Sequence, residues 1–235
     1  MKTILITGAS SGVGKACALH FLTNGWVVGL MARREEPLRE IAEAFEHAHA
    51  LPGDVTKPTD VTRCFDAFAE ATGKIDVLFN NAGIFVPAAD IDETPIEDWD
   101  RAVAVNLTGM FLCARAAFGQ MRKQGGGRII NNGSVSAHVP REGAVTYTTT
   151  KHAITGMTKQ LSLDGRALNI CCGQIDIGNA ESEMVAAMKA KVPDLPTMAV
   201  ADVARTVLHM ADLPLDTNML TATIMANRMP YVGRG

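Results

Sequence analysis

Short apolar runs alternate along the chain with longer stretches in which apolar and polar residues repeat at helical spacing. The short runs are rich in aliphatic and β-branched side chains, which is typical of buried strands. The longer stretches place apolar residues three or four positions apart, the spacing of one face of a helix. The pattern predicts strands near residues 3–7, 26–31, 51, 75–80, 128–132 and 168–172, and helices near residues 13–24, 35–47, 60–71, 96–122 (with possible interruptions) and 146–163.

Strands that alternate with helices of this length form right-handed β-α-β crossovers and build a mostly parallel sheet. Helices then cover both faces of that sheet. The chain has no linker-like composition, no tandem repeat and no low-complexity tract. We therefore expect one doubly wound α/β domain over residues 1–235.

The positions that follow the expected strands differ in character from the strands themselves. In a doubly wound sheet the ligand lies beyond the carboxyl ends of the strands. Here those positions are mainly small, polar or glycine, whereas the preceding runs are apolar. This contrast predicts a binding rim. Its segments are residues 7–14, 33–34, 54–55, 80–83, 133–134 and 173–175.

The first rim segment, T-G-A-S-S-G-V-G at residues 7–14, places three glycines between a strand and a helix. Glycines there permit a tight turn, and the N–H groups at the helix start can face a phosphate. A P-loop needs a glycine at position 9 and a hydroxyl at position 16, but both hold alanine, which argues against phosphotransfer. The spacing also differs from G-x-G-x-x-G, so this turn alone is weak evidence for a dinucleotide.

The composition excludes some classes of partner. The 22 basic and 25 acidic residues give a net charge of −3, which argues against general affinity for nucleic acid or acidic membranes. Five cysteines without a C-x-x-C pair indicate reduced core residues, and no His or Cys cluster has the spacing of a zinc site. The apolar run at residues 4–6 is too short for a signal peptide. We expect a cytoplasmic protein with no metal.

Five motifs follow one another in order: T-G-x-x-x-G-x-G at residues 7–14, N-N-A-G at residues 80–83, Asn106, Ser134, and Y-x-x-x-K at Tyr147 and Lys151. Tyr147 lies 13 positions after Ser134. In this order and spacing the chain resembles the classical short-chain dehydrogenase/reductase family, from residue 2 to about residue 212. The resemblance implies a Rossmann-like sheet of seven strands and a nicotinamide-dependent oxidoreductase.

Tyr147 and Lys151 are four residues apart, so a helix would place them on one face. An ammonium beside a phenol favours the phenolate, which makes Tyr147 a candidate general acid and base between a carbonyl compound and a secondary alcohol. The Ser134 hydroxyl could hold the substrate oxygen. The resemblance further implies that Lys151 binds the nicotinamide ribose and that Asn106 positions a water that relays protons to Lys151.

Each of these residues has a simpler interpretation when it is taken alone. A tyrosine and a lysine at this spacing are more often a solvated pair on a helix surface. An asparagine such as Asn106 is more often buried and hydrogen-bonded than catalytic. Their joint order after a phosphate-binding turn favours the catalytic interpretation.

The end of the second strand bears on the choice of dinucleotide. NAD-preferring relatives carry an acidic residue there, whereas this chain has Ala32 followed by Arg33. An arginine can pair with a 2′-phosphate, so we expect NADP(H) to be favoured and NAD(H) to remain possible. The alternative is that Arg33 and Arg34 only balance Glu35 and Glu36 at the start of the next helix. By position, the cofactor-binding residues are Gly8, Ser10, Ser11, Gly12, Val13, Gly14, Arg33, Asp54, Val55, Asn81, Ala82, Gly83, Tyr147, Lys151 and Ile175.

The resemblance weakens after the sixth expected strand. Cys172 and Ile177 stand where relatives carry a proline and a threonine that contacts the carboxamide, and Asn179 or Ser182 could substitute for that threonine. Residues 178–196 form the expected substrate loop. Its apolar residues at helical spacing are Met184, Val185 and Met188, and further candidates for the pocket wall are Phe85, His138, Val139 and Val145.

We therefore expect an oxidoreductase that acts on a small-molecule carbonyl and alcohol pair. The alternative from another class is a non-catalytic dinucleotide-binding sensor or scaffold on the same fold, which would have no use for the full catalytic set. The resemblance also implies that helices near residues 97–122 and 147–163 pair between subunits, in a homodimer or homotetramer.

Overall fold

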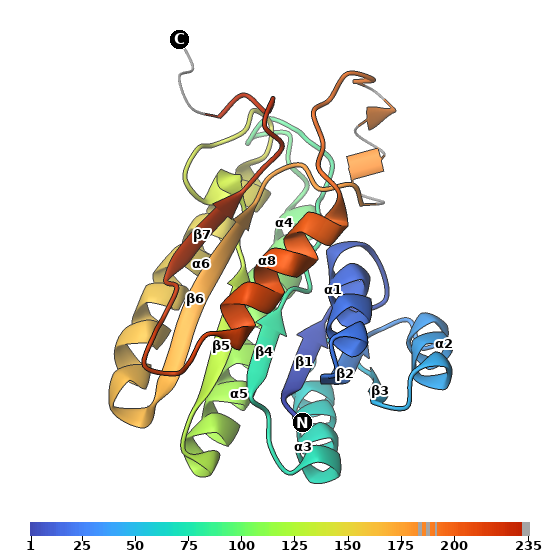
Figure 1. Cartoon of the computed structure of the whole chain (residues 1–235). Helices are drawn as coiled ribbons and strands as arrows, with labels where there is room; N and C mark the ends of the chain where they lie inside the picture. The colour runs from blue at the N-terminus through green and yellow to red at the C-terminus, as the bar shows by residue number, and fades with distance from the viewer. Residues whose placement is uncertain (183–184, 187–188, 191, 232–235) are drawn as a thin grey trace.

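The computed structural model describes residues 1–182, 185–186, 189–190 and 192–231. Within them, seven strands form one sheet in the order β3-β2-β1-β4-β5-β6-β7 (Figure 1). The strand order reverses between β1 and β4, next to the centre of the sheet. The strands are β1 (Thr3–Thr7), β2 (Val27–Ala32), β3 (Ala48–Pro52), β4 (Val77–Asn80), β5 (Gly127–Asn132), β6 (Ile170–Ile177) and β7 (Thr221–Ile224).

Every strand pairing among the described residues is parallel. All five residues of β1 are buried, as expected for a strand covered on both faces. In the register, Leu5 of β1 lies opposite Gly29 of β2 on one side and Leu78 of β4 on the other. The prediction of a doubly wound, mostly parallel seven-stranded sheet is confirmed.

Helices cover the two faces of the sheet in separate layers (Figure 1). The layer in front in Figure 1 buries Phe21, Leu38 and Val203 against Ile4 and Ile6 of β1. It comprises α1 (Gly12–Thr23), α2 (Glu36–Ala44) and α8 (Val200–Asp212).

The opposite layer buries Phe65, Phe68 and Cys113 against Leu5 and Leu78. Each fully buried large apolar side chain contributes about 1.5–3 kcal/mol, so these two layers hold the sheet rigid behind its carboxyl edge. The helices of this second layer are α3 (Pro58–Thr72), α5 (Met110–Gln124) and α6 (Val145–Gly165).

The long helix expected at residues 96–122 is interrupted. It consists of α4 (Ile96–Val103), a π-helical turn η1 (Ala104–Gly109) and then α5. Turns of this wide kind are rare and occur frequently at functional sites. Asn106 lies in η1 and is buried, so the interruption contains one of the candidate site residues predicted from the sequence.

The stretch Ile96–Gln124 is the one helix among the described residues that is long and apolar enough to cross a membrane by length and composition. Its α5 part packs against α3 and β5, and Cys113 and Met121 belong to the core of the second layer. We therefore interpret this stretch as a core helix.

The sixth strand is longer than the sequence predicted. β6 continues to Ile177, whereas Gly173, Gln174 and Ile175 had been expected to follow the strand. Gln174 and Asp176 are polar, but both are completely buried and hydrogen-bonded inside the strand. As a result Ile175 lies within β6 and packs in the core of the front layer, so its expected place beyond the strand end is wrong.

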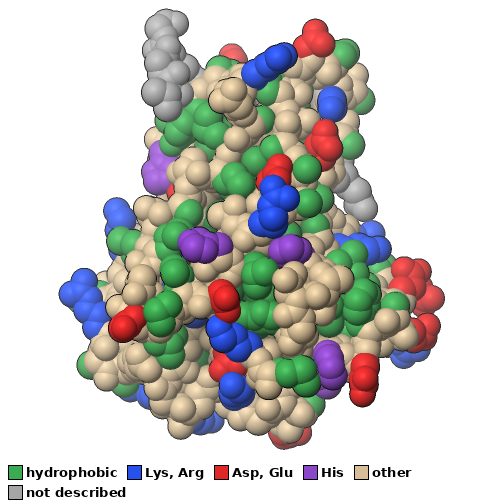
Figure 2. All heavy atoms as spheres, viewed as in Figure 1, with side chains coloured by type: hydrophobic (Ala, Val, Ile, Leu, Met, Phe, Trp, Pro, Cys, Tyr) green, Lys and Arg blue, Asp and Glu red, His purple; other side chains and the backbone are tan. Residues whose placement is uncertain are grey.

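The surface and the thiols bear on the remaining expectations. On the face that carries α1 and α8, hydrophobic, basic and acidic side chains are interspersed (Figure 2). All five cysteines are free and buried, and desolvation raises the pKa of the Cys17, Cys113 and Cys172 thiols. These three thiols are therefore neutral groups of the interior. Among the described residues, no cluster of three or more His, Cys, Asp or Glu could hold a metal ion.

Candidate active site

A cavity of about 440 Å³ opens at the carboxyl ends of the central strands, beside the point where the strand order reverses. Open α/β sheets bind their ligands in this crevice, and the volume lies in the range of about 300–1,000 Å³ found for small-molecule sites. The structure brings most of the sequence-predicted residues to its wall. They are Gly8, Ser10, Ser11, Gly12, Val13, Gly14, Arg33, Asp54, Val55, Asn81, Ala82, Gly83, Tyr147 and Lys151.

Three predicted residues are not part of this wall. Ile175 is in the core, as described above, and Ser134 and Asn106 lie behind the lining with exposed fractions of 3% and 1%. The sequence in turn missed several residues that do line the cavity. They are Gly53, Ile84, Val105 and Asn132.

The glycine-rich turn adopts a conformation that side chains would prevent. Gly8 and Gly12 have φ angles of +71° and +53°, in the left-handed region that favours glycine. A Cβ on Gly14 would lie 2.2 Å from the carbonyl oxygen of Gly8. The lack of side chains therefore lets α1 begin directly against the end of β1.

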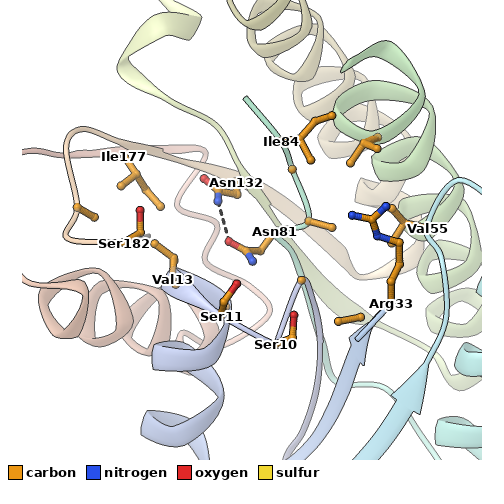
Figure 3. Close-up of a pocket in the computed structure, with 18 of the residues that line it drawn as sticks. Ser10, Ser11, Val13, Arg33, Val55, Asn81, Ile84, Asn132, Ile177 and Ser182 are labelled. Atoms are coloured by element: carbon orange, nitrogen blue, oxygen red, sulfur yellow. Dashed lines mark hydrogen bonds between the residues drawn. The ribbon is translucent and has the colours of Figure 1, made fainter. Parts of the chain in front are cut away.

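The start of α1 suits an anionic group. The N–H groups of the first turn of a helix lack intrahelical partners, and the helix dipole is positive there. The described first turn of α1 contains no acidic residue. Ser10 and Ser11 lie at the entrance to this turn (Figure 3). The turn has the features of a phosphate-binding cradle.

Asn81 ties together the ends of three strands. Its Nδ2 donates to the Thr7 carbonyl oxygen over 2.9 Å, and its Oδ1 accepts a hydrogen bond of 2.8 Å from Asn132 Nδ2 (Figure 3). The Thr7 hydroxyl also accepts from the backbone N–H groups of Asn81 and Ala82. These bonds fix the floor of the cavity between β1, β4 and β5.

Two arginines follow β2 and line the cavity. Arg33 lies on the same side as Val55 (Figure 3), and Arg34 donates to Ser10 Oγ over 3.3 Å. No carboxylate of the described residues pairs with Arg33, because Glu35 forms its ion pair with Arg39 instead. The alternative in which Arg33 only balances neighbouring acids is therefore not the arrangement observed.

Tyr147 and Lys151 face the cavity from α6. Lys151 is buried, and its Nζ donates to the carbonyl oxygen of Asn132 over 2.7 Å. The same Nζ lies 5.5 Å from the centre of the Tyr147 ring, and the Phe85 ring packs against Tyr147 at a centroid distance of 5.1 Å. One of the three ammonium donors is thus used by Asn132, which leaves two for a ligand.

Ser134 and Asn106 are held from behind the cavity. The Ser134 N–H donates to Asp176 Oδ1 over 3.0 Å, and its Oγ accepts from the Ser136 N–H over 3.1 Å. Asn106 exchanges two hydrogen bonds with the backbone of Ile84, at 2.7 and 2.9 Å. The Asn106 side chain therefore braces a residue of the cavity wall, and it uses one donor and one acceptor of its amide in doing so.

The wall opposite Arg33 is more apolar. Ile177 and Ser182 lie there near Val13 (Figure 3), and Val185 also lines the cavity. Asn179 does not, because it is buried and its Nδ2 donates to the Pro196 carbonyl oxygen. Of the other candidates for the pocket wall, Met184 and Met188 lie outside the described residues, and Phe85, His138, Val139 and Val145 are not among the lining residues.

This fold, with a glycine-rich cradle at the reversal point and a tyrosine and lysine on the facing helix, defines a dinucleotide-binding oxidoreductase architecture. The family model of the short chain dehydrogenases matches residues 2–193. The chain therefore belongs to the short-chain dehydrogenase family, which confirms the resemblance seen in the sequence.

Known proteins agree with this assignment. A 2-(R)-hydroxypropyl-CoM dehydrogenase of Xanthobacter autotrophicus is 35% identical over 227 residues, which cover 89% of this chain and 91% of the relative. The closed form of serine dehydrogenase complexed with NADP+ superimposes with a TM-score of 0.92 at 25% identity, covering 99% of this chain and 98% of that one.

A third match is a 3-ketoacyl-(acyl-carrier-protein) reductase from Brucella melitensis complexed with NADH. It has a TM-score of 0.89 at 25% identity and covers 97% of this chain and 98% of the other. These two solved structures thus hold one nicotinamide dinucleotide with a 2′-phosphate and one without it, on the same fold.

The packing of the glycine-rich turn leads to a first prediction. Gly14→Ala should lower the free energy of unfolding by about 1–3 kcal/mol, because the new methyl group would overlap the Gly8 carbonyl oxygen. Gly119→Ala is the matched control, since no atom lies within 4 Å of a Cβ there. It should leave stability unchanged or raise it by up to about 1 kcal/mol, because alanine is the better helix former. Urea unfolding of both variants checks this, and equal stability of the two would contradict it.

Proposed function

We propose that this protein is an NADP(H)-dependent oxidoreductase that interconverts a carbonyl compound and a secondary alcohol. The observation that carries the proposal is the pairing of Tyr147 and Lys151 on one wall of the cavity, with Lys151 anchored to Asn132. A protein that only bound a dinucleotide would not need this pair together with Ser134.

The cavity suits a dinucleotide. The space left by the glycines and the open N–H groups of α1 fit a pyrophosphate. Asp54, Val55 and Asn81 are assigned to the adenosine half, and Tyr147 and Lys151 to the nicotinamide ribose. When bound, the cofactor supplies or accepts the hydride. The match of the chain to structures complexed with NADP+ and NADH supports this assignment.

Tyr147 is assigned the proton transfer. In the direction of reduction, its hydroxyl donates a proton to the carbonyl oxygen as a hydride reaches the carbonyl carbon, and the product is the alcohol. In the direction of oxidation, its phenolate takes the alcohol proton. The Lys151 ammonium lies 5.5 Å from the ring centre, so a positive charge is close to the group that gives and takes the proton.

Ser134 is assigned to the substrate oxygen. Its Oγ already accepts from the Ser136 N–H, so the hydroxyl hydrogen is left to donate to an oxygen on which negative charge develops. Asn106 holds Ile84 in place, and its proton-relay role stays a prediction. Ser182 is our candidate for the missing carboxamide contact, because it lines the cavity and Asn179 does not.

The substrate is assigned only to a chemical class. The wall near Ile177 and Val185 is apolar, which fits a small carbonyl compound or its secondary alcohol. The name of the Xanthobacter relative, a dehydrogenase of a hydroxypropyl compound, supports the same class.

The family resemblance and the surface together support a homo-oligomer. The two helices expected at the subunit interface each expose a large apolar side chain, Phe111 on α5 and Leu163 on α6, with exposed fractions of 52% and 54%. Covering such side chains stabilises association. We therefore propose that α5 and α6 pair between copies of this chain.

Tyr147→Phe should lower kcat for carbonyl reduction by at least about a hundredfold, because general acid catalysis contributes about 10²–10⁴-fold. The dissociation constant for NADPH should rise by less than about tenfold, since no charge is lost and only one hydrogen bond to the nicotinamide ribose is removed. Tyr231→Phe removes the hydroxyl of the other of the two tyrosines and serves as the control. Steady-state rates at the nicotinamide absorbance give the answer, and a fully active Tyr147→Phe variant would remove the catalytic assignment.

Arg33→Ala should raise the dissociation constant for NADPH by about tenfold or more and leave that for NADH nearly unchanged, because only NADPH carries the 2′-phosphate. Arg39→Ala is the matched control, since Arg39 is exposed and paired with Glu35 on α2. Fluorescence titration with both cofactors measures the effect. An equal loss for both would mean that Arg33 does not select the phosphate.

Phe111→Arg should lower the mass of the particle in solution, because a charge would be buried in the proposed interface. Ile91→Arg is the control, since Ile91 is 76% exposed and lies outside both helices. Light scattering after gel filtration distinguishes the two. A monomeric wild-type protein would rule out the proposed pairing.

A further inference from the structure

A row of buried polar side chains crosses three adjacent strands beneath the catalytic edge. Asn80 of β4, Asn131 of β5, and Gln174 and Asp176 of β6 are each at most 1% exposed. Strand interiors of a doubly wound sheet are normally apolar, and buried polar groups cost free energy unless they are hydrogen-bonded. The mechanism described above makes no use of Gln174 or Asp176.

The hydrogen bonds of this row all run in one direction. Asn80 Nδ2 donates to Asn131 Oδ1, Asn131 Nδ2 donates to Thr158 Oγ1, and the Thr158 hydroxyl donates to Gln174 Oε1. Gln174 Nε2 then donates to Asp176 Oδ1 over 2.6 Å. Donors aligned head to tail polarise one another, and here they end on a carboxyl group.

Asp176 holds both ends of the segment that contains the catalytic serine. Its Oδ1 accepts from the Ser134 N–H at 3.0 Å, and its Oδ2 lies 2.7 Å from His138 Nε2. Gly133 makes room for this carboxyl group, because a Cβ there would lie 2.1 Å from Asp176 Oδ1. The backbone on either side of Ser134 is thus fitted around Asp176.

Gln174 connects the same carboxyl group to the helix that carries the acid. Its Nε2 donates to Thr155 Oγ1 over 3.0 Å as well as to Asp176. The Thr155 hydroxyl in turn donates to the carbonyl oxygen of Lys151. A continuous path of hydrogen bonds therefore joins the Ser134 backbone to α6 at Lys151.

We propose that Gln174 and Asp176 act as positioning residues, which set Ser134 relative to Tyr147 and Lys151. The inference rests on the proposed function, since it assumes that these three residues act on one substrate oxygen. An apolar pair of similar size would fill the same space without desolvating a carboxyl group, but it would leave the Ser134 N–H unpaired. The need to pair the Ser134 N–H therefore explains why these two buried positions are polar.

The test separates geometry from charge. Asp176→Ala removes the acceptor of the Ser134 N–H and should lower kcat by roughly tenfold to a hundredfold, the cost of a displacement of about 1 Å at a reacting group. Asp176→Asn keeps a carbonyl oxygen in that place and should retain kcat within about threefold. For both variants the dissociation constant for NADPH should change less than about twofold, because the cofactor cradle is untouched.

A double-mutant cycle shows whether Asp176 acts through the serine. In a Ser134→Ala background, Asp176→Ala should lower the residual kcat by less than about threefold, because its effect is already lost. Equal losses in both backgrounds, or wild-type kcat in Asp176→Ala, would overturn the proposal. So would a loss confined to NADPH binding.

A milder variant and a second measurement cover the other outcomes. Thr155→Val removes the acceptor of Gln174 on α6 and also the bond from the Thr155 hydroxyl to the Lys151 carbonyl oxygen. A fall in kcat of about threefold is expected from the loss of the bond to Gln174. Thr206→Val on α8 loses the same kind of bond to its own helix, Thr206 Oγ1 to Asp202 O, and is the matched control. Equal kcat in these two variants would contradict the positioning role of Gln174, even if Asp176→Ala does not fold.

Hydrogen exchange of the cofactor-free protein tests whether Asp176 holds the segment around Ser134, and this measurement needs no enzymatic activity. The peptide spanning residues 134–138 should exchange at least about tenfold faster in Asp176→Ala than in wild type, since its anchoring bond is gone. An unchanged exchange rate of this peptide in Asp176→Ala would overturn the proposal. If wild type reduces no carbonyl compound but this peptide still loses protection, the proposed function fails, and the inferred positioning of Ser134 for catalysis is overturned with it.

Discussion

The close approach of α1 to the end of β1 is the contact on which the site depends. It exists because Gly14 has no side chain to meet the Gly8 carbonyl oxygen, and because Gly8 adopts a positive φ. Helix packing in the front layer, with Phe21 in the core, then holds the helix start in place. The cradle is thus a product of both the local turn and the layer behind it.

Asn132 joins the two halves of the cavity. Its side chain donates to Asn81, which lies beside the glycine-rich turn, and its carbonyl oxygen accepts from Lys151 of α6. It is the last residue of β5, so the rigid sheet fixes both bonds at once. The spacing between Asn81 and Lys151 is therefore governed by a strand end and not by a flexible loop.

Much of the fold follows from the sequence, because short apolar runs and helical spacing report burial directly. The cavity wall was accessible too, since glycine turns and strand ends have local signals. Ile175 was misplaced for a physical reason: Gly173 and Gln174 have the small and polar character expected of the rim. Only the structure shows that Gln174 and Asp176 are buried, with partners such as Thr155 and Ser134 that are distant in sequence. Asn132 likewise owes its place to contacts with Asn81 and Lys151, which are distant in sequence.

The π-helical turn η1 couples the orientation of Asn106 in the interior to that of Phe111 on the surface. Each residue of an α-helix advances the chain by about 100° around its axis. The extra residue of the wide turn therefore decides both where Asn106 points and which face of α5 carries Phe111 outward. A deletion of one residue in Ala104–Gly109 would rotate one of these against the other. The number of residues in this helix, more than their identity, therefore sets the orientation of the buried Asn106 side chain relative to the exposed Phe111 side chain.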